Sequence, residues 1–266
     1  MLVTTVFFTG LQFVCERTFK GIVKPFIKKC ASEKELDMRA TKSAKYFYRF
    51  FYFFFAVLWG FSVLIDQPYM PPCMGGKGSL SVMWQDFPYQ KHAPQLKEYL
   101  LWLSGYHNGG LVMHFATSRK NDFVEMGLHH IVAMYLFGGC YLFQAWEIGG
   151  VIALLHDIAD VTTGIVKCLA ETRFGTATAV FFVTHMGIWA YTRLMLLPWM
   201  IYTIWITPVD FKSAVVKPAF VYLLSCMFIL HWYWFLLFCK LLKKYMKSGS
   251  TEDEQSKTSV VKKKAE

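Results

Sequence analysis

The sequence lacks any segment long and polar enough to form a separate soluble domain. Only 17% of its 266 residues are charged, whereas 55% are hydrophobic. Apolar runs near the length of a bilayer crossing follow one another, and charged residues bound each run. A run of about 20 apolar residues can cross the hydrocarbon core as a helix. The composition therefore excludes a soluble globular chain and predicts an all-α, polytopic membrane protein.

Several short motifs are also missing. The seven cysteines form no C-x-x-C pair and mostly lie inside apolar runs, which argues against a zinc site or a disulfide framework. The histidines form no H-x-x-H-H box, which disfavours a di-iron lipid hydroxylase or desaturase. The opening run lacks a basic start and a small-residue cleavage site, so we expect a retained helix and not a signal peptide.

Apolar runs and charge together predict seven transmembrane helices, with a kink near Pro198 in the sixth because proline removes a backbone donor. The expected spans are 1–16, 46–65, 97–116, 123–143, 147–166, 178–206 and 219–241. Nine Lys and Arg lie in 16–45 and eight lie from Lys240 to Lys264, which accounts for the net charge of +10 without nucleic acid. The positive-inside rule then places the N-terminus in the lumen and the C-terminus in the cytosol.

Three regions follow from this organisation. We expect an N-terminal helix and basic cytosolic segment at 1–45, a transmembrane domain at 46–241, and a disordered cytosolic tail at 242–266. The segment 66–96, rich in Pro and Gly, is predicted to be a lumenal loop.

Ionisable side chains gather within the apolar runs, where they are costly and usually functional. Spacings of three and four residues place the histidine and aspartates of the fifth span on one side of their helix. Lone histidines such as His185 and His231 more often form helix–helix hydrogen bonds. An aspartate pair could also merely neutralise the arginine of the sixth span. The cluster comprises His129, His130, His156, Asp157, Asp160 and Arg193.

The stretch from Arg119 to Lys167 resembles the signature of ceramide synthases, the acyl-transferring branch of the TLC-domain membrane proteins. A basic R-K-x-D-F-like loop precedes a His-His pair, and His-Asp-x-x-Asp begins 27 residues after the first histidine, with a lysine seven residues beyond. Gly149 and the R-L-x-x-x-P segment at Arg193 also match. The region 46–241 would then be a TLC-type helical bundle.

The sequence departs from the family pattern at four positions. Ala133 stands where the family usually has Thr, Gln144 where it has Asn, Glu147 where it has Arg, and Gly164 where it has Glu. These departures leave both a divergent enzyme and an inactive descendant open.

The resemblance implies transfer of a fatty acyl group from acyl-CoA to the nitrogen of a sphingoid base. A histidine suits this chemistry as a base or as an acyl-carrying nucleophile, and Asp157 or Asp160 would fix an imidazole tautomer. No metal or resident cofactor is implied, and acyl-CoA is a co-substrate. The candidate substrate-binding residues are Arg119, Lys120, Lys167 and Arg193, and Arg173 is a further cation for the phosphates of CoA.

The expected partners are acyl-CoA, a sphingoid base and membrane lipids, with no nucleic acid, and a homo- or hetero-oligomer is left open. Two other functions remain: a non-catalytic TLC-fold lipid-binding or structural subunit of a membrane complex, and a relative of the translocating-chain-associated membrane protein. Lys263 and Lys264 near the end resemble a dilysine retrieval signal. We therefore expect residence in the endoplasmic reticulum membrane.

Overall fold

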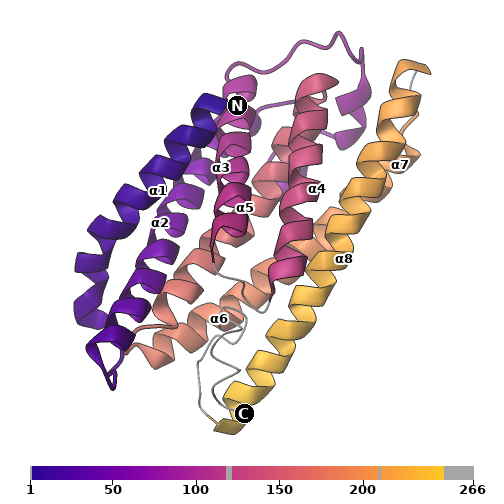
Figure 1. Cartoon of the computed structure of the whole chain (residues 1–266). Coiled ribbons are helices and arrows are strands. Elements are labelled where there is room, and N and C mark those ends of the chain that lie inside the picture. Colours follow the sequence, from indigo (N-terminus) through magenta and orange to yellow (C-terminus); the bar gives the residue numbers. More distant parts are fainter. Residues whose placement is uncertain (1, 118–121, 209–210, 249–266) are drawn as a thin grey trace.

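The computed structural model describes residues 2–117, 122–208 and 211–248, and these residues form seven helical rods (Figure 1). The sixth rod consists of α6, a π-helical segment at Ala190–Leu196, and α7. The helices are α1 Leu2–Val23, α2 Glu33–Leu64, α3 Leu96–Ala116, α4 Phe123–Leu142, α5 Trp146–Leu169, α6 Gly175–Trp189, α7 Leu197–Ile206 and α8 Phe211–Ser248. Short 3₁₀ turns lie at Lys24–Phe26, Pro72–Met74 and Leu80–Trp84. The all-α polytopic architecture is confirmed.

Several helices are longer than the sequence predicted. Helix α1 continues to Val23, and α2 begins at Glu33, so much of the basic segment is helical. Ser32 caps α2 by accepting a hydrogen bond from the Glu35 backbone N–H at 3.2 Å, which stabilises a start thirteen residues before the predicted one. Helix α8 runs to Ser248, so 242–248 are helical and not a disordered tail, because Leu and Lys favour helix. The tail from 249 onward lies outside the described residues.

Five described helical segments are long and apolar enough to cross a membrane. They are Glu33–Leu64, Phe123–Leu142, Trp146–Leu169, Gly175–Ile206 and Val216–Lys247. Helices α1 and α3 complete the bundle beside them, with α3 packing against α1, α4 and α5. The lower hydropathy of α3 has a structural reason, because it turns polar side chains such as Tyr106 and His107 toward the interior.

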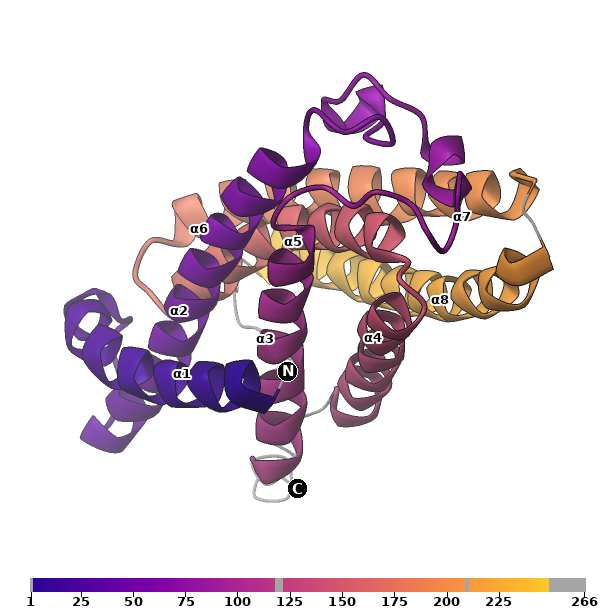
Figure 2. The same ribbon diagram turned by 90° about the horizontal axis from the view of Figure 1, so that it is seen from above.

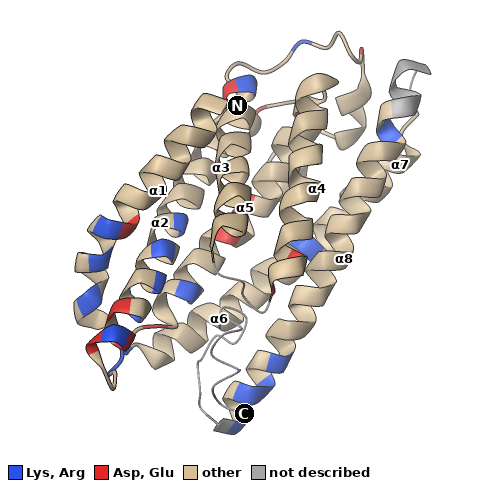
Figure 3. Cartoon of the chain, viewed as in Figure 1, with Lys and Arg blue, Asp and Glu red and all other residues tan. Residues whose placement is uncertain are grey.

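Lysine and arginine side chains gather at one end of the bundle, where α1, α5 and α8 end and α2 begins (Figure 3). We call this the basic end. The 66–95 segment covers the opposite end, where α5 and α8 begin (Figure 1). This one-sided arrangement matches the charge alternation seen in the sequence.

Helix α5 lies at the centre of the bundle, between α2, α3, α4 and α6 (Figure 2). Small residues allow its neighbours to approach closely. A side chain at Gly164 would come within 2.8 Å of the Phe50 backbone on α2, and one at Gly149 would come within 2.8 Å of the Cys140 sulfur on α4. Close packing of α2 thus leaves no room for a side chain at Gly164. The polar residues of α5 consequently lie in the interior of the bundle, with Asp157 buried and His156 and Asp160 partly buried.

Candidate functional site

The π-helical segment places Arg193 in the middle of the bundle. Pro198 has no backbone N–H, so the α-helical bond to Leu194 cannot form, and the Leu197 N–H reaches back five residues to the Thr192 carbonyl. The kink predicted at Pro198 is therefore a π-helical turn beginning eight residues earlier. Such turns are frequent at functional sites.

Arg193 connects three helices through its guanidinium group, which is 2% exposed. Nη2 lies 3.0 Å from Asp160 Oδ2 and donates to the His156 carbonyl at 3.0 Å, both on α5. The guanidinium carbon lies 4.2 Å from the centre of the Trp189 ring. Arg193 is thus neutralised by Asp160, as the simpler interpretation of the aspartates proposed.

A directed chain of hydrogen bonds runs from Arg193 through His231 to His156. Arginine can only donate, so its Nη1 donates to His231 Nδ1 at 3.4 Å. His231 then carries its proton on Nε2 and donates to His156 Nε2 at 3.0 Å. His156 Nδ1 in turn donates to the Ile152 carbonyl at 2.7 Å. A backbone carbonyl, and not an aspartate, therefore fixes the tautomer of His156.

His129 differs from His156 because its ring is not engaged in this way. Its Nδ1 is buried and has no hydrogen-bond partner among the described residues. The ring lies near His231, with centroids 6.4 Å apart, and packs edge-on against Trp234 at 5.5 Å. His129 and His156 thus approach His231 from α4 and α5.

The neighbouring His130 points elsewhere, as adjacent helical residues must. It faces α3, where a side chain at Gly110 would meet its ring at 3.1 Å. Its Nδ1 also lacks a partner within the described part of the chain. His130 therefore lies beside the centre formed by the other histidines, on its α3 side.

Asp157 is 1% exposed, and its Oδ2 has no hydrogen-bond partner within the described ranges. An unpartnered buried carboxylate oxygen is costly. It lines the same cavity as His129 and His156. The site therefore contains a buried polar atom without a hydrogen-bond partner among the described residues on both α4 (His129 Nδ1) and α5 (Asp157 Oδ2).

An apolar channel extends from these histidines toward the end opposite the basic end, between α4, α5 and α8. Eleven residues of α4 separate His129 from Cys140 at the far end, or about 16 Å of helix. Ala133, one of the departures, lies one turn from His129 and keeps the channel open. The other apolar lining residues are Leu136, Phe137, Ile148, Gly149, Ile152, Ala153, Phe220, Leu224 and Met227.

A polar vestibule opens from the same histidines toward the basic end. It shares His107, His129 and Asp160 with the channel. Its outer part is lined by Lys45, Arg49 and Lys167. The Arg49 guanidinium carbon and Lys167 Nζ lie 5.6 and 5.4 Å from the centre of the Tyr46 ring. Thus the structure brings Lys167 to the site.

The remaining predicted cations are not placed at the site. Arg173 lies over Phe174 at 5.6 Å and does not line the vestibule. Arg119 and Lys120 lie outside the described residues. Within the described part of the chain, no three His, Cys, Asp or Glu side chains form a group that could hold a metal ion.

The departures at the α4–α5 turn have their own partners. Glu147 is 3% exposed, with Oε1 2.8 Å from His92 Nδ1 and Oε2 accepting from Gln90 Nε2 at 3.1 Å. Gln144 has a φ of 56°, a left-handed conformation that asparagine adopts more readily. The charge reversal at Glu147 therefore attaches the 66–95 segment to α5, at a distance from the histidines.

Sequence reasoning missed three residues of this site. His231 was interpreted as a helix–helix contact, which is confirmed, but it also lies between His129 and His156. His107 and Arg49 were not singled out because neither belongs to a recognisable motif. Their position inside the bundle depends on how α2 and α3 rotate, which no local pattern determines.

Comparison with known proteins identifies the family of the chain. A model of the TLC domain family matches residues 42–240. The chain is 30% identical to ceramide synthase 4 of Mus musculus over 213 residues, which cover 79% of this chain and 52% of the mouse protein. It is 25% identical to ceramide synthase hyl-2 of Caenorhabditis elegans over 184 residues, covering 64% of this chain and 56% of the relative. It is 26% identical to ceramide synthase LOH2 of Arabidopsis thaliana over 179 residues, covering 64% and 60%.

The fold and the site define a polytopic helical membrane protein with a polar centre enclosed by its spans. The chain belongs to the TLC domain family, on its ceramide synthase branch. It spans about half the length of the mouse and worm relatives.

Proposed function

We propose that this protein transfers a fatty acyl group from acyl-CoA to the amino group of a sphingoid base. The observation that carries the proposal is the position of His129. Its buried Nδ1 has no partner in the described part of the chain, and its ring lines both the apolar channel and the polar vestibule. A thioester with its chain in the channel and its CoA in the vestibule would present its carbonyl carbon beside this ring.

The reaction joins an amine to a thioester carbonyl. The amine nitrogen, once deprotonated, forms a C–N bond while the C–S bond breaks, and the released thiolate takes a proton to give CoA. His129 would accept the proton of the amine and return it to the sulfur, or would first carry the acyl group itself. His156 is less suited as the first base, because the His231 N–H occupies its Nε2 lone pair. Arg193 and Asp160 would hold His231 and α5 in position.

The vestibule suits the CoA moiety. Lys45, Arg49 and Lys167 supply positive charge at the basic end, where phosphate groups would bind. The charge pattern favours a cytosolic basic end, and acyl-CoA is a water-soluble thioester that would enter from that side. The same pattern would put the N-terminus in the lumen, and the similarity to ceramide synthases supports residence in the endoplasmic reticulum membrane.

An in vitro assay of the purified full-length chain with acyl-CoA and sphinganine tests the proposal. We expect His129→Ala to lower the rate at least 100-fold while the protein still inserts and keeps its thermal stability, because the ring Nδ1 has no hydrogen-bond partner among the described residues. His92→Gln, a histidine at the opposite end, is the matched control and should keep the rate within about threefold. Full activity of His129→Ala would refute the assignment. No transfer by the folded wild type, with any acyl-CoA, would favour a non-catalytic lipid-binding member of the family.

A further inference from the structure

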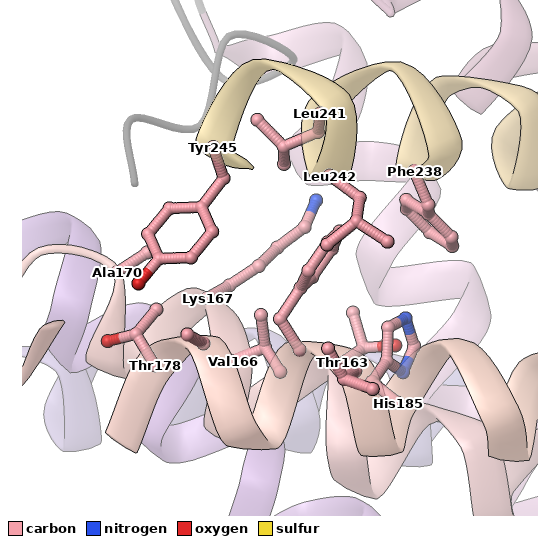
Figure 4. A pocket seen from close by; sticks show the side chains of 13 residues that line it. Thr163, Val166, Lys167, Ala170, Thr178, His185, Phe238, Leu241, Leu242 and Tyr245 are labelled. Carbon is pink, nitrogen blue, oxygen red and sulfur yellow. The ribbon is translucent and has the colours of Figure 1, made fainter. Parts of the chain in front are cut away.

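A second apolar groove lies between α5, α6 and α8 near the basic end (Figure 4). Leu241, Leu242 and Phe238 of α8 form one wall, and Val166 of α5 and Thr178 of α6 lie on the other. Phe182 of α6 also lines the groove. The groove shares no lining residue with the apolar channel. It shares Thr163, Lys167 and Phe238 with the polar vestibule, so it adjoins the vestibule and not the apolar channel.

The groove runs from the surface of the bundle to its interior. Val183 at the outer part is 56% exposed and faces the membrane side of α6, whereas His185 on the next part of the helix is 2% exposed. Phe238 is 7% exposed and packs against His185, with ring centroids 5.2 Å apart. Phe238 and Thr163 line both cavities and therefore separate the groove from the vestibule.

The polar groups at the inner end of the groove are arranged to accept hydrogen bonds. Thr162 Oγ1 donates to the Ala159 carbonyl at 2.8 Å, so it accepts from His185 Nδ1 at 2.8 Å. His185 therefore keeps an acceptor lone pair on Nε2. Thr163 Oγ1 likewise donates to the Ala159 carbonyl at 3.0 Å and retains its lone pairs. The carboxylate of Asp160 lies beyond, in the vestibule.

Lys167 lines both the groove and the vestibule. Its Nζ lies 5.4 Å from the Tyr46 ring centre on α2. In Figure 4 the side chain runs along the back of the groove. A long side chain of this kind buries its stem against apolar surface and keeps its ammonium elsewhere. The groove therefore offers an apolar wall that ends in acceptor groups.

We infer that this groove is the binding site and side entrance for the acceptor, a long-chain amino alcohol, separate from the channel that holds the acyl chain. The inference rests on the proposed function. An amine with adjacent hydroxyls is rich in hydrogen-bond donors and matches the acceptors of His185, Thr163 and Asp160. The alkyl chain would lie between α6 and α8 and continue past Val183 into the membrane. The two hydrocarbon chains would thus meet at the histidines from opposite ends of the site.

Kinetics of a variant that fills the groove test this assignment. We expect Val183→Trp to raise the KM for sphinganine at least tenfold and to leave the KM for acyl-CoA within twofold. Val180→Trp is the matched control, because Val180 is 60% exposed on the same helix and does not line the groove. An unchanged KM for sphinganine, or an equal rise for both substrates, would overturn the inference.

Photolabelling distinguishes a failure of this inference from a failure of the proposed function. A diazirine-tagged sphinganine should label peptides from 178–185 and 238–245 in the wild-type chain, in competition with untagged sphinganine, whether or not transfer occurs. Labelling confined to residues of the apolar channel would overturn the inference. Equal labelling by a diazirine phosphatidylcholine that sphinganine does not displace would also overturn it, since the groove would then hold ordinary membrane lipid.

Discussion

Histidines that share one motif differ in their hydrogen-bond partners. The sequence places His129 and His156 on equal terms, but His156 is held between Ile152 and His231, whereas Nδ1 of His129 has no partner in the ranges described. Spacing can indicate that a histidine is buried, yet it cannot indicate which lone pair is occupied. The sequence therefore predicted which histidines lie in the helices, and the structure shows which of their ring nitrogens are hydrogen-bonded.

The Arg193–Asp160 pair is expected to be a stabilising element in its own right. Removing one partner of a buried ion pair leaves an uncompensated charge, at a cost of about 3–5 kcal/mol. Arg193→Met should therefore lower the thermal unfolding temperature strongly. The double variant Arg193→Met with Asp160→Asn should be no less stable than Arg193→Met alone, because both charges are gone. Additive losses in unfolding measurements on the purified protein would show that the two residues do not act as a pair.

At the scale of the helices, the break in the sixth rod controls where Arg193 points. Proline was expected to kink the helix, and its real effect is one π-helical turn over Ala190–Leu196. The sequence predicted a local defect at Pro198, but the choice between a kink and a π-turn depends on which carbonyls neighbouring helices satisfy. The π-helical turn therefore affects the site through Arg193, which lies within it.

Restoring the missing donor should disturb the site. Pro198→Ala supplies a backbone N–H, so α6 can continue as an α-helix. The π-helical turn holds one residue more than an α-helical turn, so its conversion would shift the register by one residue and rotate Arg193 by about 100° relative to α7. We expect at least a tenfold fall in acyl transfer. Pro218→Ala within α8 is the control and should stay within about threefold. Equal activity of both variants would show that the π-turn does not position Arg193.

The apolar channel makes a separate prediction about chain length. Ala133→Phe would fill the channel one turn from His129, about 6 Å along α4. Long-chain acyl-CoA should then lose at least tenfold in kcat/KM, while butyryl-CoA should keep its value within about threefold. Gly138→Phe on the same helix is the control, since an added Cβ there meets nothing within 4 Å. An equal loss with long and short acyl-CoA would argue against the channel as the acyl site.

At the scale of the whole molecule, periodicity and charge predicted the number of helical rods and the gathering of basic residues at one end. They did not predict that α5 would be central, because its glycines and alanines permit close packing without specifying a partner. They also missed His107 and Arg49, which join the site only through the packing of α2 and α3. The histidine and aspartate motif of α4 and α5 therefore predicted the centre of the site, and its remaining residues come from the packing of α2 and α3 against those helices.

The orientation can be tested with the natural cysteines. Cys30 lies at the basic end and exposed Cys73 at the opposite end. In sealed microsomes, a membrane-impermeant maleimide should label Cys30 directly and Cys73 only after permeabilisation. Partial desolvation raises the pKa of the Cys73 thiol, so less thiolate is present at neutral pH and labelling should be faster at pH 8.5. Direct labelling of Cys73, with Cys30 labelled only after permeabilisation, would show that the basic end faces the lumen.

The central claim is that the histidine site transfers an acyl group between two lipid substrates. The most direct measurement is the stoichiometry of the reaction catalysed by the purified wild-type chain in lipid vesicles. With acyl-CoA and sphinganine present, we predict one mole of free CoA thiol for each mole of N-acyl sphinganine, and no amide when either substrate is withheld. CoA release accompanied only by free fatty acid, or no release at all from the folded protein, would contradict the account.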